Sequence, residues 1–393
     1  MSASAAEVDY RSDVSESGRE RTSGPMDRTY FLLVWALMVT GIVFVFSASF
    51  PRASRPDAML LPGDPYRHLV PHALFVAISL VAMLIVSVLP LRFLRKAAPW
   101  AFVAGVVLMG LVLFSPWGVT SGGARRWLDV PGLPSFQPSE LMKVAFILLL
   151  AHFLARKDEA AGDRVTSFGW VLVLAVGIGG LLLMQRDQGM ATIYSAIAFA
   201  MLFFAGMNLW KLIPLALSAV GAALLLAYQE PYRWRRIMAF IDLENAPPDD
   251  RYHILNMLIA QARGGITGTG LGMSPDKWHS LPAPHTDSVF SVIGAEMGLI
   301  GGLVLLVVVG LVAWRGLQIA RRSDNAFGFY VAAGVTTMLC VQSLAHIAVN
   351  ASCMPVTGLT LPFISGGGTS LLSASIAAGL VLAVSRYSRR GEP

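Results

Sequence analysis

Apolar residues recur along the chain in runs of about 20, which is the length that a helix needs to cross the roughly 30 Å hydrocarbon core of a bilayer. A membrane-spanning barrel would instead show alternating strands of about 10 residues. The pattern therefore predicts an all-α polytopic membrane protein with about ten transmembrane helices. The predicted spans are residues 30–50, 68–90, 98–115, 138–155, 167–184, 190–206, 208–228, 288–313, 326–349 and 368–386.

Two polar stretches interrupt this pattern. Residues 1–28 are mixed in charge and lack the apolar core of a signal peptide, so we expect a disordered cytoplasmic tail before a single transmembrane domain of residues 29–390. Residues 231–287 are far longer than the roughly 2–8 residues that usually connect bundle helices. We expect them to form a large, ordered extracytoplasmic loop between the seventh and eighth helices, because residues 254–260 have the pattern of a short amphipathic helix at the membrane interface.

The distribution of charge predicts the orientation. Only 14% of the residues are charged, against about 25% in soluble domains, and Lys and Arg exceed Asp and Glu by 30 to 24. Basic residues of membrane proteins gather in the cytoplasmic loops. With the tail inside, the basic segments 92–96, 156–164, 315–322 and 386–390 all fall on that side. Both termini are therefore expected in the cytoplasm, and the positive charge needs no nucleic-acid partner to explain it.

Further basic residues fall on the outer side, against this preference. A long loop tolerates such charge, and one interpretation gives it no role. The other is an electropositive surface for the anionic headgroup of a phosphorylated lipid, such as a pyrophosphate, which arginine binds through a fork of donors. The residues are Arg125, Arg126, Arg233, Arg235, Arg236, Arg251, Arg263 and Lys277.

A few ionisable residues lie within or beside the predicted spans, where each costs several kcal/mol unless it is paired or hydrated. Glu140 and Lys143 stand at i and i+3 at the start of the fourth span, close enough to pair on one helix face. Asp187 follows Gln185 at the turn between the fifth and sixth spans. Two interpretations stay open, namely a neutralised cluster that holds helices together and the lining of a water-filled cavity beneath the outer loops.

The ninth span carries Gln342, His346 and Asn350 at every fourth position, which places them on one helix face. Hydrogen bonds between helices explain such a stripe, and the lining of a cavity is the alternative. No second His or carboxylate stands at ligand spacing from His346, so we predict no metal site there. Cys340 and Cys353 are the only cysteines and predict no disulfide framework.

His285, Thr286 and Asp287 end the large loop. A carboxylate at the outer membrane surface could act as a general base toward a sugar hydroxyl, but Asp is also an ordinary residue at a helix start. The glycine-rich residues 264–272 match neither a Walker nor a dinucleotide-binding pattern. We expect a turn there that needs close backbone approach.

A series of motifs follows one another along the chain. They are Ser47-Ala48-Ser49, Gly123-Ala124-Arg125-Arg126-Trp127, Phe136-Gln137-Pro138-Ser139-Glu140 with Lys143, then Gln185, Asp187 and Gly189, Gly264-Gly265 to Gly272, Leu281-Pro282 with His285-Thr286-Asp287, Pro355-Val356-Thr357-Gly358, and Leu361-Pro362-Phe363-Ile364-Ser365. In this order they resemble the motifs of the SEDS family (shape, elongation, division and sporulation), whose members include RodA and FtsW. The resemblance implies a ten-helix fold and a peptidoglycan glycosyltransferase that polymerises lipid II into glycan strands at the outer face of the bacterial cytoplasmic membrane.

The resemblance also implies roles for particular residues. Asp287 is expected to be the catalytic base for the acceptor hydroxyl, with the pyrophosphate lipid as leaving group. No cofactor is expected with certainty, although a divalent cation could bridge the pyrophosphates, and no ligand set for it is legible. The implied partners are lipid II and the nascent glycan strand, membrane lipid, and a class B penicillin-binding protein, which is a single-span transpeptidase. The expected substrate-binding residues are Arg126, Trp127, Glu140, Lys143, Gln185, Asp187, Lys277, His285 and Thr286.

The chain departs from the family's pattern at several positions. The family usually has a glutamate before the His-Thr-Asp triplet, where this chain has Ala283 and Pro284. Arg186 replaces a proline, His346 an asparagine and Gly366 a tyrosine.

Two other classes of function compete with the glycosyltransferase. One is a flippase of the lipid-linked precursor, because helices with buried charges also suit alternating access. The other is a non-catalytic scaffold of the division or elongation machinery. A glycosyltransferase needs a base at the outer surface and a flippase does not, so Asp287 discriminates between these two functions. The tail and the sequence Gly358-Leu359-Thr360-Leu361-Pro362 slightly favour a division protein, and Pro355-Val356-Thr357-Gly358 an elongation protein.

Overall fold

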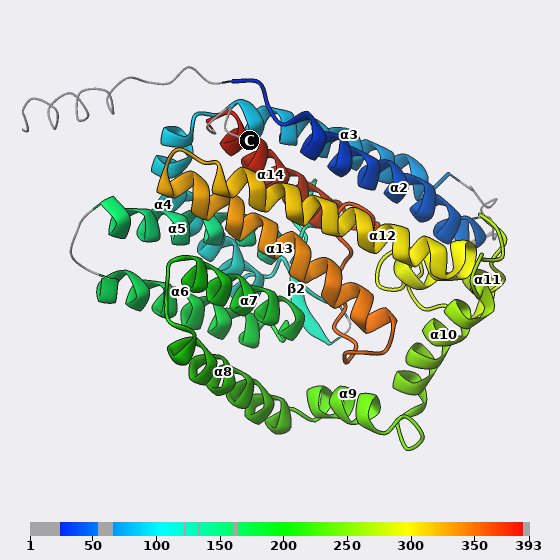
Figure 1. The fold of residues 1–393 in the computed structure, drawn as a ribbon. Coiled ribbons are helices and arrows are strands. Elements are labelled where there is room, and N and C mark those ends of the chain that lie inside the picture. Colours follow the sequence, from blue (N-terminus) through cyan, green and yellow to red (C-terminus); the bar gives the residue numbers. More distant parts are fainter. Residues whose placement is uncertain (1–23, 54–65, 122, 133, 160–163, 388–393) are drawn as a thin grey trace, which may run out of the picture.

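The computed structural model describes residues 24–53, 66–121, 123–132, 134–159 and 164–387. These form a bundle of long helices with one small β-hairpin (Figure 1). Among these described residues, eight helices are long and apolar enough to cross a membrane, and Phe168–Met184 and Gln188–Phe204 are shorter apolar helices. Together they confirm the predicted polytopic all-α fold. The helices that match the predicted spans are α2 (Arg28–Ala53), α3 (Leu69–Val88), α4 (Leu91–Phe114), α5 (Pro138–Glu159), α6 (Arg164–Met184), α7 (Gln188–Phe204), α8 (Leu209–Gln229), α12 (Val289–Arg321), α13 (Ala326–Asn350) and α14 (Gly368–Ser385).

The centre of the bundle is built by α5, α13 and α14. The apolar windows of α5 and α14 are each 83% buried and that of α13 is 72% buried, whereas α8 is only 6% buried and lies at the periphery. Small residues let central helices approach closely, which is how packing is achieved where lipid removes the hydrophobic drive between helices. On α14, a Cβ added to Gly379 would lie 2.6 Å from the carbonyl oxygen of Met83 on α3. That contact explains a glycine in the middle of the helix.

The two ends of the described chain meet. The backbone N–H of Gly24 donates to the carbonyl of Arg386 at 2.9 Å, and Asp27 forms a salt bridge with Arg315 of α12 at 2.7 Å. An even number of crossings brings both ends to one side of the membrane, as the charge pattern predicts. Most of the predicted tail, residues 1–23, lies outside the described residues, and its last residues, from Gly24, are held against α12 and α14.

The large loop contains three helices, α9 (Pro231–Ile241), α10 (Pro248–Gly264) and α11 (Asp276–His279). The predicted amphipathic helix lies within α10. Figure 1 shows α10 and α11 at the end of the bundle opposite the C-terminus. The loop is therefore on the other side from the chain ends.

The glycine-rich turn after α10 packs against a break in α12. Gly298 interrupts α12 with φ 65° and ψ −163°, and the N–H of Leu299 donates to the carbonyl of Gly265 at 2.9 Å. Gly268, at φ +85°, sits so close to the carbonyl of Glu296 that an added Cβ would collide with it. The predicted close backbone approach is confirmed, and it requires glycine because a side chain fits neither the space nor the backbone angle.

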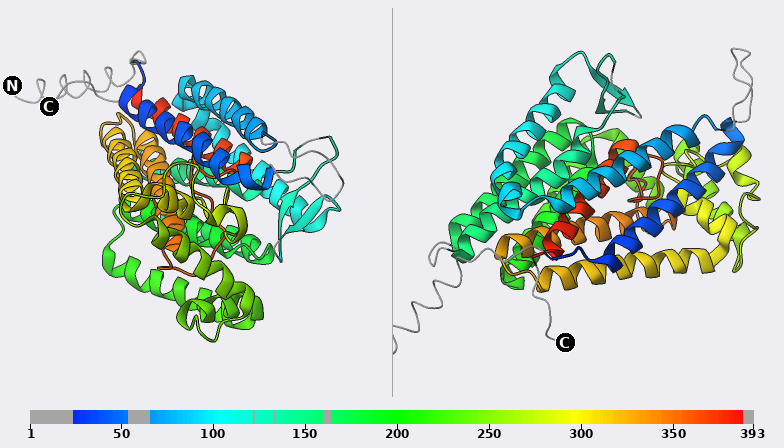
Figure 2. Two further views of the ribbon diagram at one scale, coloured as in Figure 1. Left: turned by 90° about the vertical axis from the view of Figure 1, so that its right-hand side faces the viewer. Right: turned by 90° about the horizontal axis from the view of Figure 1, so that it is seen from above.

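A β-hairpin that the sequence analysis did not predict connects α4 to α5. Strands β1 (Gly118–Ser121) and β2 (Ala124–Leu128) pair antiparallel and project beyond the end of α4 (Figure 2). The Arg125 guanidinium donates to the carbonyl of Ser115 at 2.6 Å, which ties the hairpin to the helix end. The hairpin places Arg126 and Trp127 beside the start of α5.

Candidate functional site

A buried ion pair lies in the first turn of α5. Lys143 Nζ is 2.7 Å from a carboxylate oxygen of Glu140, and both side chains are at most 5% exposed. The same ammonium donates to Gln342 Oε1 of α13 at 2.6 Å. The predicted i,i+3 pairing is confirmed, and the pair also links α5 to α13.

Asp187 is buried where several elements meet. As the N-cap of α7 it accepts from the N–H of Met190 at 3.2 Å, and its other oxygen accepts from Gln137 Nε2 at 3.1 Å. Arg126 Nη1 of β2 lies 3.5 Å from Asp187 Oδ1. Gln185 is buried as well, and its amide donates to the carbonyl of Met109 at 3.0 Å. Asp187 thus fixes the hairpin and the segment before α5 to the start of α7.

Asp287 directly precedes Ser288, the N-cap of α12, and its side chain is partly exposed. Asn350 Nδ2 donates to its backbone carbonyl at 2.9 Å. The Asp287 carboxylate lies beside Gly358: a Cβ added to Gly358 would be 3.8 Å from Asp287 Oδ2. Within the part of the chain that the structure describes, no hydrogen bond or salt bridge engages this carboxylate. It is therefore available to accept a proton from a bound hydroxyl group.

The two residues before Asp287 are held through their main chains. The N–H of Gly366 donates to the carbonyl of His285 at 2.7 Å, and Ser365 Oγ donates to the carbonyl of Thr286 at 2.8 Å. The His285 ring stacks on His68 with centroids 5.5 Å apart. The segment after α13 therefore fixes the His-Thr-Asp triplet.

His253 of α10 is a neighbour of Asp287 that the sequence analysis missed. Burial lowers the pKa of His253 from its ordinary value of 6.5, with the Asp287 and Asp250 charges acting upward and Arg236 acting downward. Its Nε2 is buried without a hydrogen-bond partner among the described residues. Arg236 in turn donates to the carbonyl of Val356 at 3.1 Å. Nothing in the spacing of the sequence indicates this contact, because α10 reaches Asp287 only through the fold.

Several of the outer basic residues face carboxylates. Arg263 lies 2.6 Å from Asp276, and Arg235 lies 3.1 Å from Asp250. Lys277 is buried, with its Nζ 2.7 Å from Glu296 Oε1 and 2.8 Å from Ser47 Oγ. These contacts hold α11 and α10 in place, so part of the predicted positive surface is neutralised within the protein.

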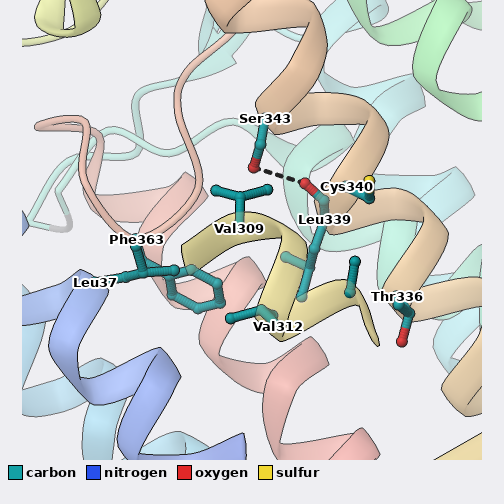
Figure 3. A pocket seen from close by; sticks show the side chains of 9 residues that line it. Leu37, Val309, Val312, Thr336, Leu339, Cys340, Ser343 and Phe363 are labelled. Atoms are coloured by element: carbon teal, nitrogen blue, oxygen red, sulfur yellow. Dashed lines mark hydrogen bonds between the residues drawn. The ribbon is translucent and has the colours of Figure 1, made fainter. Parts of the chain in front are cut away.

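A small apolar pocket lies elsewhere, between α2, α12 and α13 (Figure 3). Two hydroxyl groups line it, and both bond within their own helix: Ser343 donates to the carbonyl of Leu339 and Thr336 to that of Ala332, each at 2.7 Å. Val309 in its wall is about 30 Å along α12 from Asp287, at a rise of about 1.5 Å per residue. The pocket is separate from the polar groups described above.

The family model described as "Cell cycle protein", which covers FtsW, RodA and SpoVE, matches residues 27–390. The chain belongs to this family. A probable peptidoglycan glycosyltransferase FtsW of Idiomarina loihiensis is 34% identical over 373 residues, or 94% of this chain and 89% of the relative. One of the same name in Alkalilimnicola ehrlichii is 36% identical over 367 residues, or 93% and 90%.

Solved structures agree with this membership. A chain of a peptidoglycan synthase complex that coordinates polymerization and crosslinking is 28% identical, with a TM-score of 0.73 over 92% of this chain and 98% of that one. The Thermus thermophilus rod shape determining protein RodA is also 28% identical, with a TM-score of 0.67 over 93% of this chain and 98% of RodA. The resemblance of the motifs to the FtsW and RodA family is confirmed.

Two departures from the family's pattern have visible structural effects. Arg186 adopts φ 60°, a left-handed conformation that a proline cannot take, and lies 3.8 Å from Glu230 with both side chains exposed. At Gly366, an added Cβ would approach the carbonyl of His285 to 3.0 Å. The absence of a side chain at Gly366 lets the segment after α13 close onto the His-Thr-Asp triplet.

Proposed function

We propose that the chain is a peptidoglycan glycosyltransferase that polymerises lipid II into glycan strands, with Asp287 as the general base. The observation that carries the proposal is the free, partly exposed Asp287 carboxylate on the loop side of the bundle, in a chain whose FtsW relatives are named as probable peptidoglycan glycosyltransferases. The site lies at the outer face of the bacterial cytoplasmic membrane. The positions of the loop helices, opposite the basic chain ends, support this orientation.

The chemistry follows from the position of the carboxylate. Asp287 takes the proton of the acceptor sugar's hydroxyl group, and the hydroxyl oxygen forms a bond to the anomeric carbon of the donor. The bond between that carbon and the pyrophosphate oxygen breaks, and the pyrophosphate lipid leaves with the bonding electrons. No redox partner is needed. The main chains of His285 and Thr286 are held by hydrogen bonds from residues 365 and 366, and this fixes the position of Asp287 next to them.

Arg126 is suited to hold the pyrophosphate. One guanidinium nitrogen faces Asp187 at 3.5 Å, and its Nε is buried without a hydrogen-bond partner among the described residues. An arginine with donors to spare binds a phosphate oxygen pair through its planar fork. Trp127 on the same strand, with Gln185 and the Glu140 and Lys143 pair behind it, completes the headgroup surface that we propose. Lys277, already paired with Glu296, contributes by holding α11 against α12 and α2.

A divalent cation, if bound, would supply positive charge against the departing pyrophosphate. Among the described residues, no group of three or more His, Cys, Asp and Glu side chains lies together to hold a metal ion. Mg²⁺ is commonly bound through substrate phosphates with only one or two carboxylates, so a cation here would be held mainly by the pyrophosphate itself. Polymerisation assays with and without a chelator test whether a cation is used.

The proposed partner is a class B penicillin-binding protein that crosslinks the new strands. The similar chain in the solved peptidoglycan synthase complex supports this, because that complex coordinates polymerization and crosslinking. A role in division is favoured over one in elongation, because the relatives at 34% and 36% identity are FtsW proteins, whereas RodA is 28% identical.

Polymerisation of lipid II in detergent micelles tests the function against its alternatives. A micelle has no two sides, so a flippase would produce nothing measurable there, and a scaffold would produce no strands. The purified protein, with its class B partner present, is expected to give a ladder of glycan strands on a gel. No ladder, in a preparation that still binds lipid II, would contradict the proposal.

A further inference from the structure

The polar stripe on α13 binds the backbone that surrounds Asp287. Gln342, His346 and Asn350 are all buried. Gln342 Nε2 donates to the carbonyl of Thr360 at 3.0 Å, and His346 Nδ1 lies 2.7 Å from the carbonyl of Leu359. Each polar residue of the stripe therefore contacts main chain outside its own helix.

Asn350 is the residue of the stripe nearest the proposed base. Its Nδ2 donates to the carbonyl of Asp287 at 2.9 Å, while its Oδ1 accepts from Ser291 Oγ at 2.9 Å and from the Ser291 N–H at 3.3 Å. Gln261 Nε2 of α10 donates to the backbone carbonyl of Asn350 at 2.7 Å. One side chain thus joins the last loop residue to the first turn of α12.

The geometry assigns the tautomer of His346. A carbonyl oxygen faces Nδ1, so this nitrogen carries the proton, and Nε2 is left as an acceptor at 3.3 Å from Asn350 Nδ2. A proton on Nε2 would face the Asn350 amide donors. The Asn350 amide gives its two hydrogens to the carbonyls of Asp287 and His346, at 2.9 and 3.0 Å, so His346 holds Asn350 chiefly through its main chain while its ring holds Leu359.

At its other end the stripe meets the buried ion pair. Gln342 Oε1 accepts from Lys143 Nζ at 2.6 Å, and Lys143 is paired with Glu140. Polar contacts therefore run from the ion pair in α5 to Gln342, through the main chain of Leu359 and Thr360 to His346, and from there to Asn350 and the Asp287 carbonyl. Helix packing alone would not require every polar residue of the stripe to bind main chain in the two segments that meet at Asp287 and Gly358.

We propose that Asn350 is a positioning residue, which fixes the main chain of Asp287 so that its carboxylate faces the segment around Gly358, with His346 fixing Asn350. The inference rests on the proposed function, in which Asp287 is the base. The hydrogen bond from Asn350 to the Asp287 carbonyl is 2.9 Å long, comes from a fully buried side chain, and holds the main chain of a base that must stay within a fraction of an ångström of its productive place. A misplacement of about 1 Å can cost about 10²-fold in rate.

The substitution Asn350→Leu tests this role, because leucine is similar in size and makes no hydrogen bond. We expect kcat for lipid II polymerisation to fall about 10- to 100-fold per folded molecule, with KM within about twofold of wild type. Ser343→Ala is the matched control, since Ser343 is buried on the same helix and bonds only within it. Folded protein is counted by its melting transition and by binding of lipid II.

A purely structural role would lower the melting temperature and leave kcat per folded molecule unchanged. A kcat for Asn350→Leu equal to that of Ser343→Ala overturns the inference. Should Asn350→Leu not fold, Asn350→Ser is the milder variant, and the same kcat and KM comparison decides. Asp287→Asn, measured in the same assay, separates a failure of the proposed function from a failure of the positioning role. An active Asp287→Asn contradicts the proposed base, whereas an inactive Asp287→Asn with an active Asn350→Leu contradicts the positioning role alone.

Discussion

Replacing Lys143 by methionine should strongly destabilise the protein, because it leaves the Glu140 carboxylate buried without a cation. The two side chains are 2% and 5% exposed and 2.7 Å apart, so water cannot replace the lost partner. Removing one member of such a pair costs about 3–5 kcal/mol. At roughly 2–4 °C per kcal/mol for a large domain, the melting temperature should fall by at least about 6 °C.

The double variant Glu140→Gln with Lys143→Met is the control. Replacing both charges by neutral groups is often neutral or stabilising, so most of the loss should be recovered. Melting in detergent is followed by intrinsic fluorescence. A Lys143→Met protein that melts within about 1 °C of wild type would refute the reasoning, because a desolvated charge cannot be left unpaired at so little cost.

The same double variant decides between the two interpretations of this pair. If the pair only holds α5 against α13, the stable double variant should polymerise lipid II at nearly the wild-type rate. If the pair contributes to the headgroup surface, the variant should be stable and slow.

Two further outcomes are expected. Arg126→Lys keeps the charge and loses the planar fork, so KM for lipid II should rise about 10-fold with a smaller change in kcat; a titration showing an unchanged KM would contradict the headgroup role. Because burial lowers the pKa of His253 below 6.5, the unfolded chain takes up protons that the folded protein does not, and stability should decline as pH falls below that value. His253→Gln should reduce this decline in melting profiles between about pH 5 and pH 7, and an identical profile would show that His253 is not responsible.

The spans could be predicted because apolar length is a strong local signal, but their ends could not. The eighth span was expected to end at 313, yet α12 continues to Arg321. The third was expected to start at 98, yet α4 starts at Leu91. In both places a helix continues into basic residues, since its backbone bonds do not depend on hydrophobicity and long side chains reach the interface.

The site was predictable where the signal is local. Glu140 and Lys143 meet because i and i+3 share a helix face. His253 and Gln261 could not be placed, because α10 reaches Asp287 and Asn350 only through the fold. The β-hairpin was missed for a different reason, since its strands of four and five residues are too short to show an alternating pattern.

Polymerisation of fluorescent lipid II by the purified protein with the proposed class B penicillin-binding protein, comparing wild type with Asp287→Ala and Asp287→Asn, tests the central claim most directly. Wild type should give glycan ladders, and both variants should give none while still binding lipid II and melting as wild type does. Ladders of wild-type length and rate from either variant would remove Asp287 from the chemical step.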